Sequence, residues 1–303
     1  FRQPAEVIPD AAAYTQISAG SVFPFLVFVV LRQSLQAVGS TRSIVWTIIG
    51  SNLLNAALNW VFIFGHLGSP PMGVRGSAVA TLISRWAGTF ILLAVAWKEL
   101  KPHITRLDPA ILDRATLWRM TRFGLPIGFQ QFMEVSAFAA VGLLMGTFGT
   151  EQVAAHQVAL NLAALTFMVP LAVSAAAAVR VGNALGAHDA SRSRQAARLS
   201  YYLGAGFMTL AAVLFLTVPE WLSLIYTRES GVIAISVLLI PIAGVFQVFD
   251  GLQAVGAGVL RGLGDTKVPL VAMIAGYWLI GVPVSIWLGF YTDLGPEGLW
   301  WGS

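Results

Sequence analysis

The sequence predicts an all-α polytopic membrane protein, because of its composition, its recurrent apolar segments and a repeated pattern of turns. Hydrophobic residues make up 57% of the 303 residues and charged residues only 11%, against roughly a quarter charged in a soluble domain. A soluble chain of this length needs more charge to cover its surface, so the excess apolar side chains are expected to face lipid. The sequence contains no cysteine, which excludes disulfides and thiolate metal sites.

Apolar segments of about 20 residues recur along the chain, each long enough to cross a hydrocarbon core of roughly 30 Å. Each segment predicts a helix, because unpaired backbone groups are too costly in lipid. The alternative, buried core helices of a soluble protein, fits the composition poorly. A ninth helix is expected to begin at Leu299. The eight expected spans cover residues 12–31, 43–64, 77–97, 123–148, 155–179, 199–218, 232–260 and 268–290.

Basic residues alternate between the loops. Fourteen of the eighteen Lys and Arg residues fall in every second loop, and the positive-inside rule places such loops in the cytoplasm. Phe1 is therefore expected on the outer side and the linker 99–122 on the cytoplasmic side. Residues 186–198 are expected to form a short amphipathic turn on the cytoplasmic surface. This distribution explains the net charge of +4 as topology, and no nucleic-acid partner is expected.

Two pairs of turns indicate an internal repeat. The turn GSTR (39–42) follows the first expected span, and GDTK (264–267) lies between the last two complete spans. GVRG (73–76) precedes the third span, and GPEG (295–298) precedes Leu299. Matching turns have the same orientation, which favours a parallel repeat of the kind found in secondary transporters. Chance similarity between glycine-rich turns is the alternative.

The repeat predicts a two-lobed helical bundle. Residues 1–98 are expected to be the last three helices of an incomplete first lobe, residues 99–122 a cytoplasmic basic linker, and residues 123–303 five helices of the second lobe with the start of its sixth. The full protein is then expected to have twelve helices. About eight of them are complete in this sequence, and about three are expected before Phe1.

Two acidic residues, Glu134 and Asp250, lie deep within apolar spans. A charge that faces lipid at the bilayer centre costs about 3 kcal/mol or more, so each carboxylate is expected to face a wet cavity, bind a cation or carry a proton. No cationic side chain is evident near either acid. This favours a cation site over the alternative, a hydrogen bond between helices. Glutamines accompany the acids at helical spacing: Gln130, Gln131, Gln247 and Gln253.

Other polar residues within the spans remain open to more than one interpretation. Arg85 can snorkel to the interface, pair with a residue outside this sequence, or take part in transport. Asn55 and Asn59 lie on one helix, where interhelical packing explains them as well as substrate contact does. For His156 and Asn161, near the start of another helix, a structural role is favoured.

Several motifs resemble the multidrug and toxic compound extrusion family, in its NorM-type branch. They are GLPIGFQQFMEVSAF (124–138), AAHQVALN (154–161), RVGNALGAHD (180–189), FQVFDGLQAVGAGVLRGLGDTK (246–267) and SNLLNAALNWVFIFG (51–65). The resemblance covers essentially the whole sequence. It implies two six-helix lobes around a central cavity, and drug export driven by inward movement of Na⁺ or H⁺.

The resemblance also implies site residues. Glu134 and Asp250 match the carboxylates of the family's cation site, with Na⁺ as the one metal ion considered. Some members have Tyr where this chain has Phe246, so that hydroxyl contact is expected to be lost. The family's first helix contributes an acidic residue that is not in this sequence. The substrate cavity is expected to include Asn55, Asn59, Gln130, Gln131, Phe246, Gln247 and Gln253.

The expected function is export of lipophilic organic cations against Na⁺ or H⁺, by alternating access, in the inner membrane of the cell. A monomer without cofactors is expected. The first alternative is a flippase for lipid-linked oligosaccharides, which is expected to hold several cationic residues for a pyrophosphate, whereas Arg85 stands alone. The second is a membrane-embedded enzyme; the four histidines are scattered and form no catalytic constellation, so no enzymatic activity is expected.

Overall fold

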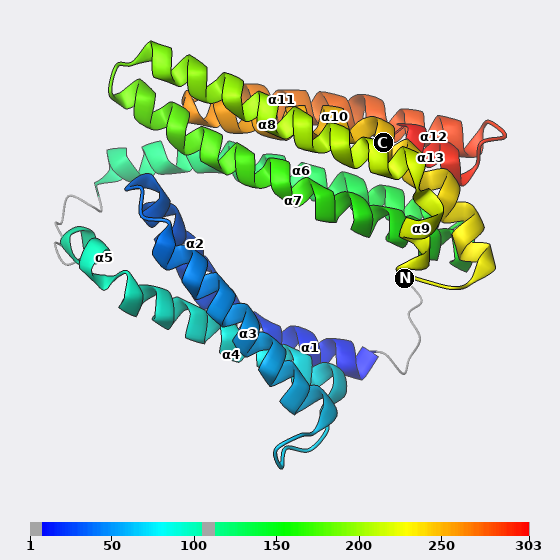
Figure 1. Cartoon of the computed structure of the whole chain (residues 1–303), viewed down its shortest axis with the longest axis horizontal. Helices are drawn as coiled ribbons and strands as arrows, with labels where there is room; N and C mark the ends of the chain where they lie inside the picture. Colours follow the sequence, from blue (N-terminus) through cyan, green and yellow to red (C-terminus); the bar gives the residue numbers. More distant parts are fainter. Residues whose placement is uncertain (1–7, 105–112, 303) are drawn as a thin grey trace. The chain divides into compact units, whose positions relative to one another are not determined.

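The computed structural model describes residues 8–104 and 113–302, and these ranges form helices joined by turns, without a strand (Figure 1). The chain divides into two compact units, Phe1–Ile111 and Leu112–Ser303. Among the described residues seven helices are long and apolar enough to cross a membrane, or eight if one bent pair counts as a single span. All eight expected spans fall on these helices, so the predicted all-α membrane fold is confirmed.

The first unit begins with two helices that meet at a bend. Helix α1 (Ile8–Ala19) and helix α2 (Val22–Ala37) are inclined by 44° to each other. Pro24 lies in the first turn of α2, where its missing N–H and its ring prevent the helix from continuing backwards into α1. The Pro24 carbonyl oxygen accepts a hydrogen bond of 2.8 Å from the Thr89 hydroxyl, which joins α2 to its neighbour.

Two further long helices and a short one complete this unit: α3 (Arg42–Phe64), α4 (Gly73–Val95) and α5 (Trp97–Ile104). Helices α3 and α4 approach closely at Gly76, where a Cβ atom would lie only 2.6 Å from the Phe62 carbonyl oxygen. A small residue at the crossing lets the two backbones touch, as is common between membrane helices.

The second unit has a core of three long helices, α7, α8 and α10, which pack against one another (Figure 1). Its largest fully buried side chains include Phe215, Leu239 and Ile240. A π-helical segment, η2, interrupts the last complete span between α11 and α12. The elements are α6 (Arg114–Met145), α7 (Thr150–Gly186), α8 (Ala190–Thr217), α9 (Pro219–Leu224), α10 (Ser230–Gly262), α11 (Lys267–Met273), η2 (Ile274–Gly281), α12 (Val282–Phe290) and α13 (Pro296–Gly302).

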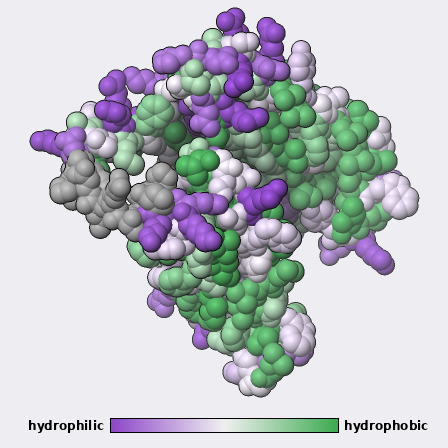
Figure 2. All heavy atoms as spheres, turned by 60° about the vertical axis from the view of Figure 1, so that its left-hand side comes forward, coloured by the Kyte–Doolittle hydropathy of each residue, from purple (hydrophilic) through white to green (hydrophobic). Residues whose placement is uncertain are grey.

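Large apolar side chains cover much of the surface of both units (Figure 2). Trp46 in α3 is 71% exposed and Leu210 in α8 is 68% exposed, each within an expected membrane span. Soluble monomers rarely expose contiguous apolar areas of this kind. The exposed apolar surface therefore suits helices that are surrounded by lipid.

Helix α6 begins nine residues before the expected start of its span, at Arg114 instead of residue 123. Asp113 caps it, because its carboxylate accepts a hydrogen bond of 3.2 Å from the Thr116 N–H. Residues 114–122, expected as part of the linker, are thus the first turns of α6. Basic side chains are good helix formers, so this helix continues past the apolar segment into the more polar region.

The expected surface turn 186–198 is also mostly helical. Helix α7 continues to Gly186 and α8 begins at Ala190, so only residues 187–189 join them. Asp189 caps α8 by accepting a hydrogen bond of 2.9 Å from the Arg192 N–H. The sequence pattern showed where the apolar segment begins, whereas the Asp189 cap sets where helix α8 begins.

Candidate functional site

The second unit brings Glu134 of α6 and Asp250 of α10 to the walls of two neighbouring cavities. One of about 240 Å³, here called the polar cavity, also has Gln130, Gln131 and Gln253 in its walls. The other, of about 320 Å³, here called the aromatic cavity, also has Phe246 and Gln247 in its walls. Both carboxylates border both cavities. The structure therefore gathers six of the polar residues that were singled out in these spans.

Helical spacing explains how α10 forms its side of the polar cavity. Asp250, Ala254, Ala257 and Arg261 all border this cavity, and their spacing of four, three and four residues places them on one face of the helix. The two alanines leave room between the charged side chains. On α6, the Gln131 amide donates a hydrogen bond of 3.3 Å to the Glu134 carboxylate.

The aromatic cavity has a different chemical character. Phe138, Phe167, Phe246, Tyr277 and Trp300 line it together with the two carboxylates. Its amide, Gln247, is buried and accepts a hydrogen bond of 2.9 Å from the Thr166 hydroxyl, which fixes its side chain. An organic cation placed here would meet both a negative charge and the faces of aromatic rings, which attract cations.

Arg261 corrects the expectation that no cationic side chain lies near the acids. It stands in the last turn of α10 and not in a loop, and its charge interacts with that of Glu134. Its guanidinium is also held locally, because Nε donates a hydrogen bond of 3.1 Å to the Ala257 carbonyl oxygen. The signal was present in the sequence, since position 261 follows Asp250 by eleven residues, which is three helical turns.

Tyr277 is a second residue that sequence reasoning missed. It lies in η2 and borders both cavities, and Gln253 borders the polar cavity with it. The next residue, Trp278, donates a hydrogen bond of 3.1 Å from its indole N–H to the Met133 carbonyl oxygen, beside Glu134. A hydroxyl was expected to be lost at Phe246, and Tyr277 brings one to the same carboxylates from another helix.

Asn55, Asn59 and Arg85 belong to the first unit. Asn55 donates a hydrogen bond of 3.4 Å to the Ser84 hydroxyl and accepts one of 2.9 Å from the Asn59 amide. Arg85 donates a hydrogen bond of 2.7 Å to the Ser21 hydroxyl. Its guanidinium also lies 5.1 Å from the centre of the Phe25 ring. Asn55 and Arg85 border a separate cavity of about 390 Å³, whereas Asn59 does not.

His156 and Asn161 border neither of the two cavities that hold the carboxylates. His156 is 5% exposed and packs edge-on against Trp300, with ring centres 5.5 Å apart. Asn161 is exposed and accepts a hydrogen bond of 3.3 Å from the Gln157 amide. Both contacts fit the structural role that was favoured for these two residues.

The oxygen atoms around the polar cavity determine which cations it suits. The carboxylates of Glu134 and Asp250, the side-chain amide oxygens of the glutamines and the Tyr277 hydroxyl are hard oxygen donors, and hard cations prefer such donors over nitrogen or sulfur. Na⁺ is a cation of this kind. A carboxylate can also bind a proton in place of Na⁺.

Comparison with known proteins covers nearly the whole chain. The MatE family model matches residues 126–287. The multidrug resistance protein NorM of Burkholderia vietnamiensis is 36% identical over 310 residues, covering 100% of this chain and 66% of that protein. A probable multidrug resistance protein NorM of Rhizobium meliloti is 37% identical over 309 residues, covering 99% of this chain and 66% of that protein.

Solved structures share the fold. The eukaryotic MATE transporter AtDTX14 has a TM-score of 0.88 and 23% identity, covering 99% of this chain and 66% of that chain. The Vibrio cholerae MATE transporter VcmN in its bent form has a TM-score of 0.82 and 22% identity, covering 99% of this chain and 66% of that chain. The present chain thus spans just under two thirds of the length of the curated relatives it matches.

Proposed function

The chain belongs to the MatE family, and we propose that the complete protein is a secondary transporter that exports lipophilic organic cations in exchange for Na⁺ or H⁺. The relatives that carry the name multidrug resistance protein support the transport of drugs. The substrate class and the coupling by a cation rest on the chemistry of the two cavities. We expect no bond-breaking step and no cofactor.

The observation that carries the proposal is that Glu134 and Asp250 each border both cavities. A small hydrated or dehydrated cation suits the polar cavity, with its amides and hydroxyl. A lipophilic cation suits the aromatic cavity, whose rings and apolar walls offset the loss of water around the cation. Because the same carboxylates serve both cavities, the two kinds of cation compete for one set of negative charges.

Charge balance indicates how many cations the site holds at once. With all three groups ionised, the two carboxylates and the Arg261 guanidinium leave one net negative charge. A charged group within the membrane is costly unless it is neutralised. One proton, one Na⁺ or one organic monocation is enough for neutrality, so binding of one is expected to release another.

This competition supplies the exchange. When the site is empty of ions, its negative charge attracts the organic cation. When Na⁺ or H⁺ enters from outside, the carboxylates are neutralised and the organic cation loses its counter-charge and leaves. The effect is reciprocal, because the organic cation must weaken ion binding by the same factor. An inside-negative potential favours inward ion movement by about 2.3 kcal/mol per charge for 100 mV.

The membrane setting follows the charge pattern. We propose that the protein lies in the inner membrane as a multi-pass monomer, with Phe1 on the outer side and the linker 99–122 in the cytoplasm. We further propose that the two units belong to two six-helix lobes.

The proposal is tested with the complete protein in proteoliposomes, by following efflux of a fluorescent cationic dye under an imposed Na⁺ or H⁺ gradient. The wild-type protein is expected to move dye only when a gradient is present, and the gradient that works identifies the ion. The variants Glu134→Gln and Asp250→Asn remove one negative charge each and keep the shape of the side chain. Gradient-driven efflux is expected to fall about tenfold or more in each. The lost carboxylate charge is expected to weaken cation binding by more than about 1.4 kcal/mol, which corresponds to a factor of ten.

The matched control is Glu220→Gln. Glu220 is an exposed acid in the first turn of α9 and borders neither cavity, so its variant is expected to transport at the wild-type rate. Size-exclusion profiles and helical content are compared first, so that a misfolded variant is recognised. Wild-type rates in both cavity variants would refute the proposal.

One observation keeps the flippase alternative worth testing. The first unit's cavity contains Arg32 as well as Arg85, so Arg85 does not stand alone as the sequence suggested. Two guanidiniums are a suitable partner for a phosphate group. Absence of dye movement under either gradient, with a folded protein, would favour this alternative, and the next assay would follow a fluorescent lipid-linked sugar.

A further inference from the structure

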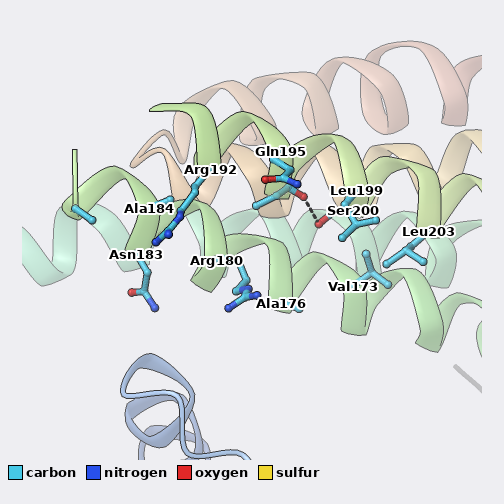
Figure 3. A pocket seen from close by; sticks show the side chains of 12 residues that line it. Val173, Ala176, Arg180, Asn183, Ala184, Arg192, Gln195, Leu199, Ser200 and Leu203 are labelled. Carbon is cyan, nitrogen blue, oxygen red and sulfur yellow. Dashed lines mark hydrogen bonds between the residues drawn. The ribbon is translucent and has the colours of Figure 1, made fainter. Parts of the chain in front are cut away.

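A hollow of about 630 Å³ lies between α7 and α8, near the turn that joins them (Figure 3). Arg180 and Asn183 border it from α7, and Arg192 and Gln195 border it from α8. It shares no residue with the two cavities that hold the carboxylates. The transport proposal therefore gives these four polar side chains no role.

The turn between the helices fixes one of the two arginines. Asp189 accepts a hydrogen bond from the Arg192 N–H, and its other carboxylate oxygen lies 3.3 Å from Arg192 Nε. The contact uses only Nε, so the two terminal nitrogens of this guanidinium remain available. In the part of the chain that the structure describes, Arg180 forms no ion pair. The hollow thus presents two guanidiniums, and the carboxylate that pairs with one of them, Asp189, does not border it.

Apolar side chains form the other part of the hollow. Val173, Leu199 and Leu203 border it at greater depth along the two helices, and Leu199 and Leu203 are 57% and 55% exposed. Helix α7 has 37 residues and is about 55 Å long, well beyond a hydrocarbon core of about 30 Å. Arg180 lies only six residues before the end of α7, about 9 Å along its axis, so a hydrocarbon core centred on this helix would leave Arg180 beside the lipid headgroups.

We propose that this hollow binds an anionic phospholipid. The headgroup phosphate lies between Arg180 and Arg192, with Asn183 and Gln195 as further donors, and one acyl chain lies along Leu199 and Leu203. Guanidiniums bind phosphate oxygens in pairs of parallel hydrogen bonds. Basic pockets between membrane helices on the cytoplasmic side favour anionic headgroups.

Charge and shape favour an anionic phospholipid over a zwitterionic lipid and over a free phosphate ion. The segment 180–198 contains four arginines and a single acidic residue, Asp189, so a headgroup with its own ammonium group is disfavoured by repulsion. A free phosphate ion would satisfy the arginines but would leave the exposed leucines without a partner. The proposal depends on α7 and α8 crossing a membrane, and it does not depend on what the protein transports.

The test uses the complete protein, purified in detergent and stripped of lipid, with dissociation constants measured by native mass spectrometry. The probes are phosphatidylglycerol, phosphatidylcholine and inorganic phosphate. The wild-type protein is expected to bind phosphatidylglycerol about tenfold more tightly than phosphatidylcholine, which corresponds to about 1.4 kcal/mol. In Arg180→Gln, which leaves the pair between Arg192 and Asp189 intact, this preference is expected to fall to about threefold or less.

The control is the double variant Arg194→Gln, Arg198→Gln, which removes more positive charge from the same segment, at positions that do not border the hollow. It is expected to keep the wild-type preference for phosphatidylglycerol.

Four results would overturn the proposal. If the control lost this preference as much as Arg180→Gln does, the positive charge of the segment would act without a defined site. Full displacement of phosphatidylglycerol by inorganic phosphate would identify a site for a soluble ion. Equal binding of both lipids by the wild-type protein, or an unchanged preference in Arg180→Gln, would mean that something else fills the hollow. Each of these results would overturn the proposal.

Discussion

Arg261 determines the charge of the candidate site, although it lies three turns from Asp250 on the same helix. Two carboxylates alone would repel each other and would attract two monovalent cations. The guanidinium reduces this demand to one, and it also competes with any entering cation for Glu134. If this is the cation site, the net charge of one predicts that it holds one monovalent cation at a time.

Replacement of Arg261 by Gln is therefore expected to tighten cation binding. The competing positive charge is lost, so the affinity for the coupling ion should rise about threefold to tenfold, while release and overall transport become slower. Isothermal titration of the complete protein in detergent measures the affinity, and dye efflux measures the turnover. Arg261→Lys, which keeps the charge, should resemble the wild-type protein. Weaker ion binding in Arg261→Gln would contradict this role.

Tyr277 offers a test in which almost nothing but one hydroxyl changes. Tyr277→Phe keeps the ring that borders both cavities and removes the hydroxyl oxygen, one of the oxygen atoms around the polar cavity. One lost ligand or hydrogen bond of about 1 kcal/mol should raise the ion concentration for half-maximal efflux about fivefold. Tyr202→Phe, at a side chain that is 76% exposed, serves as the control. An unchanged half-maximal concentration would exclude the hydroxyl as an ion ligand.

At this scale the sequence identified the acids and their glutamines, and it missed Arg261 and Tyr277 for a physical reason. A carboxylate within an apolar span is conspicuous because few functions justify its cost. Arg261 stands just beyond the expected span 232–260, where a basic residue is ordinary and draws no attention. Tyr277 depends on η2, whose wider turn changes which side chains face a cavity, and no local pattern marked that segment.

Among the elements, α7 and α10 form the most extensive contact of the second unit. Gly258 lies directly against the Ser174 backbone, and a Cβ atom on Gly262 would lie 2.7 Å from the Ala178 carbonyl oxygen. The Ser174 hydroxyl adds a hydrogen bond of 2.6 Å to the Ala254 carbonyl oxygen. This packing holds the helix that carries Asp250 firmly against α7.

Gly258→Ala is expected to separate these helices. An added methyl group has no room against the Ser174 carbonyl, and overpacking of this kind costs about 1–3 kcal/mol. The midpoint of thermal unfolding of the complete protein in detergent should fall by several degrees, as measured by a fluorescence thermal shift. Gly206→Ala, where a Cβ atom would meet nothing within 4 Å, should leave the midpoint unchanged or slightly higher. Equal effects of both changes would argue against a tight crossing.

Sequence reasoning located the long elements better than it located their ends. A run of about 20 apolar residues is a strong signal, and all eight runs became helices. The ends depended on caps such as Asp113 and Asp189, which lie outside the apolar runs. The bend between α1 and α2 was missed because Gly20, Ser21 and Pro24 stand inside a segment, 12–31, that is long and apolar enough on average to be taken as one span.

For the whole molecule, the orientation in the membrane is the most direct test. The sequence contains no cysteine, so single cysteines can be introduced at exposed positions in a cysteine-free version of the complete protein. Arg228→Cys, between α9 and α10, is expected to react with an impermeant maleimide in intact cells. Ala187→Cys, between α7 and α8, is expected to react only after permeabilisation. The opposite result would invert the proposed topology.

The repeat and the charge pattern predict two lobes and twelve helices for the complete protein. The structure divides the described helices between Ile111 and Leu112, within the range 99–122. Six-helix lobes remain a prediction, because a sequence that spans just under two thirds of its relatives does not contain every helix that the count requires.

Helix α6, which carries Glu134, makes few contacts with α7 and packs mainly against α11 and η2. Asp250 belongs to the firmly packed group of α7, α8 and α10. The two carboxylates thus stand on separately packed parts of one unit, and a cation held by both would act as a cross-link between them. Ion binding should then be detectable as mechanical stiffening: slower amide hydrogen exchange along α6 with the ion bound, without any change in the exchange of α8.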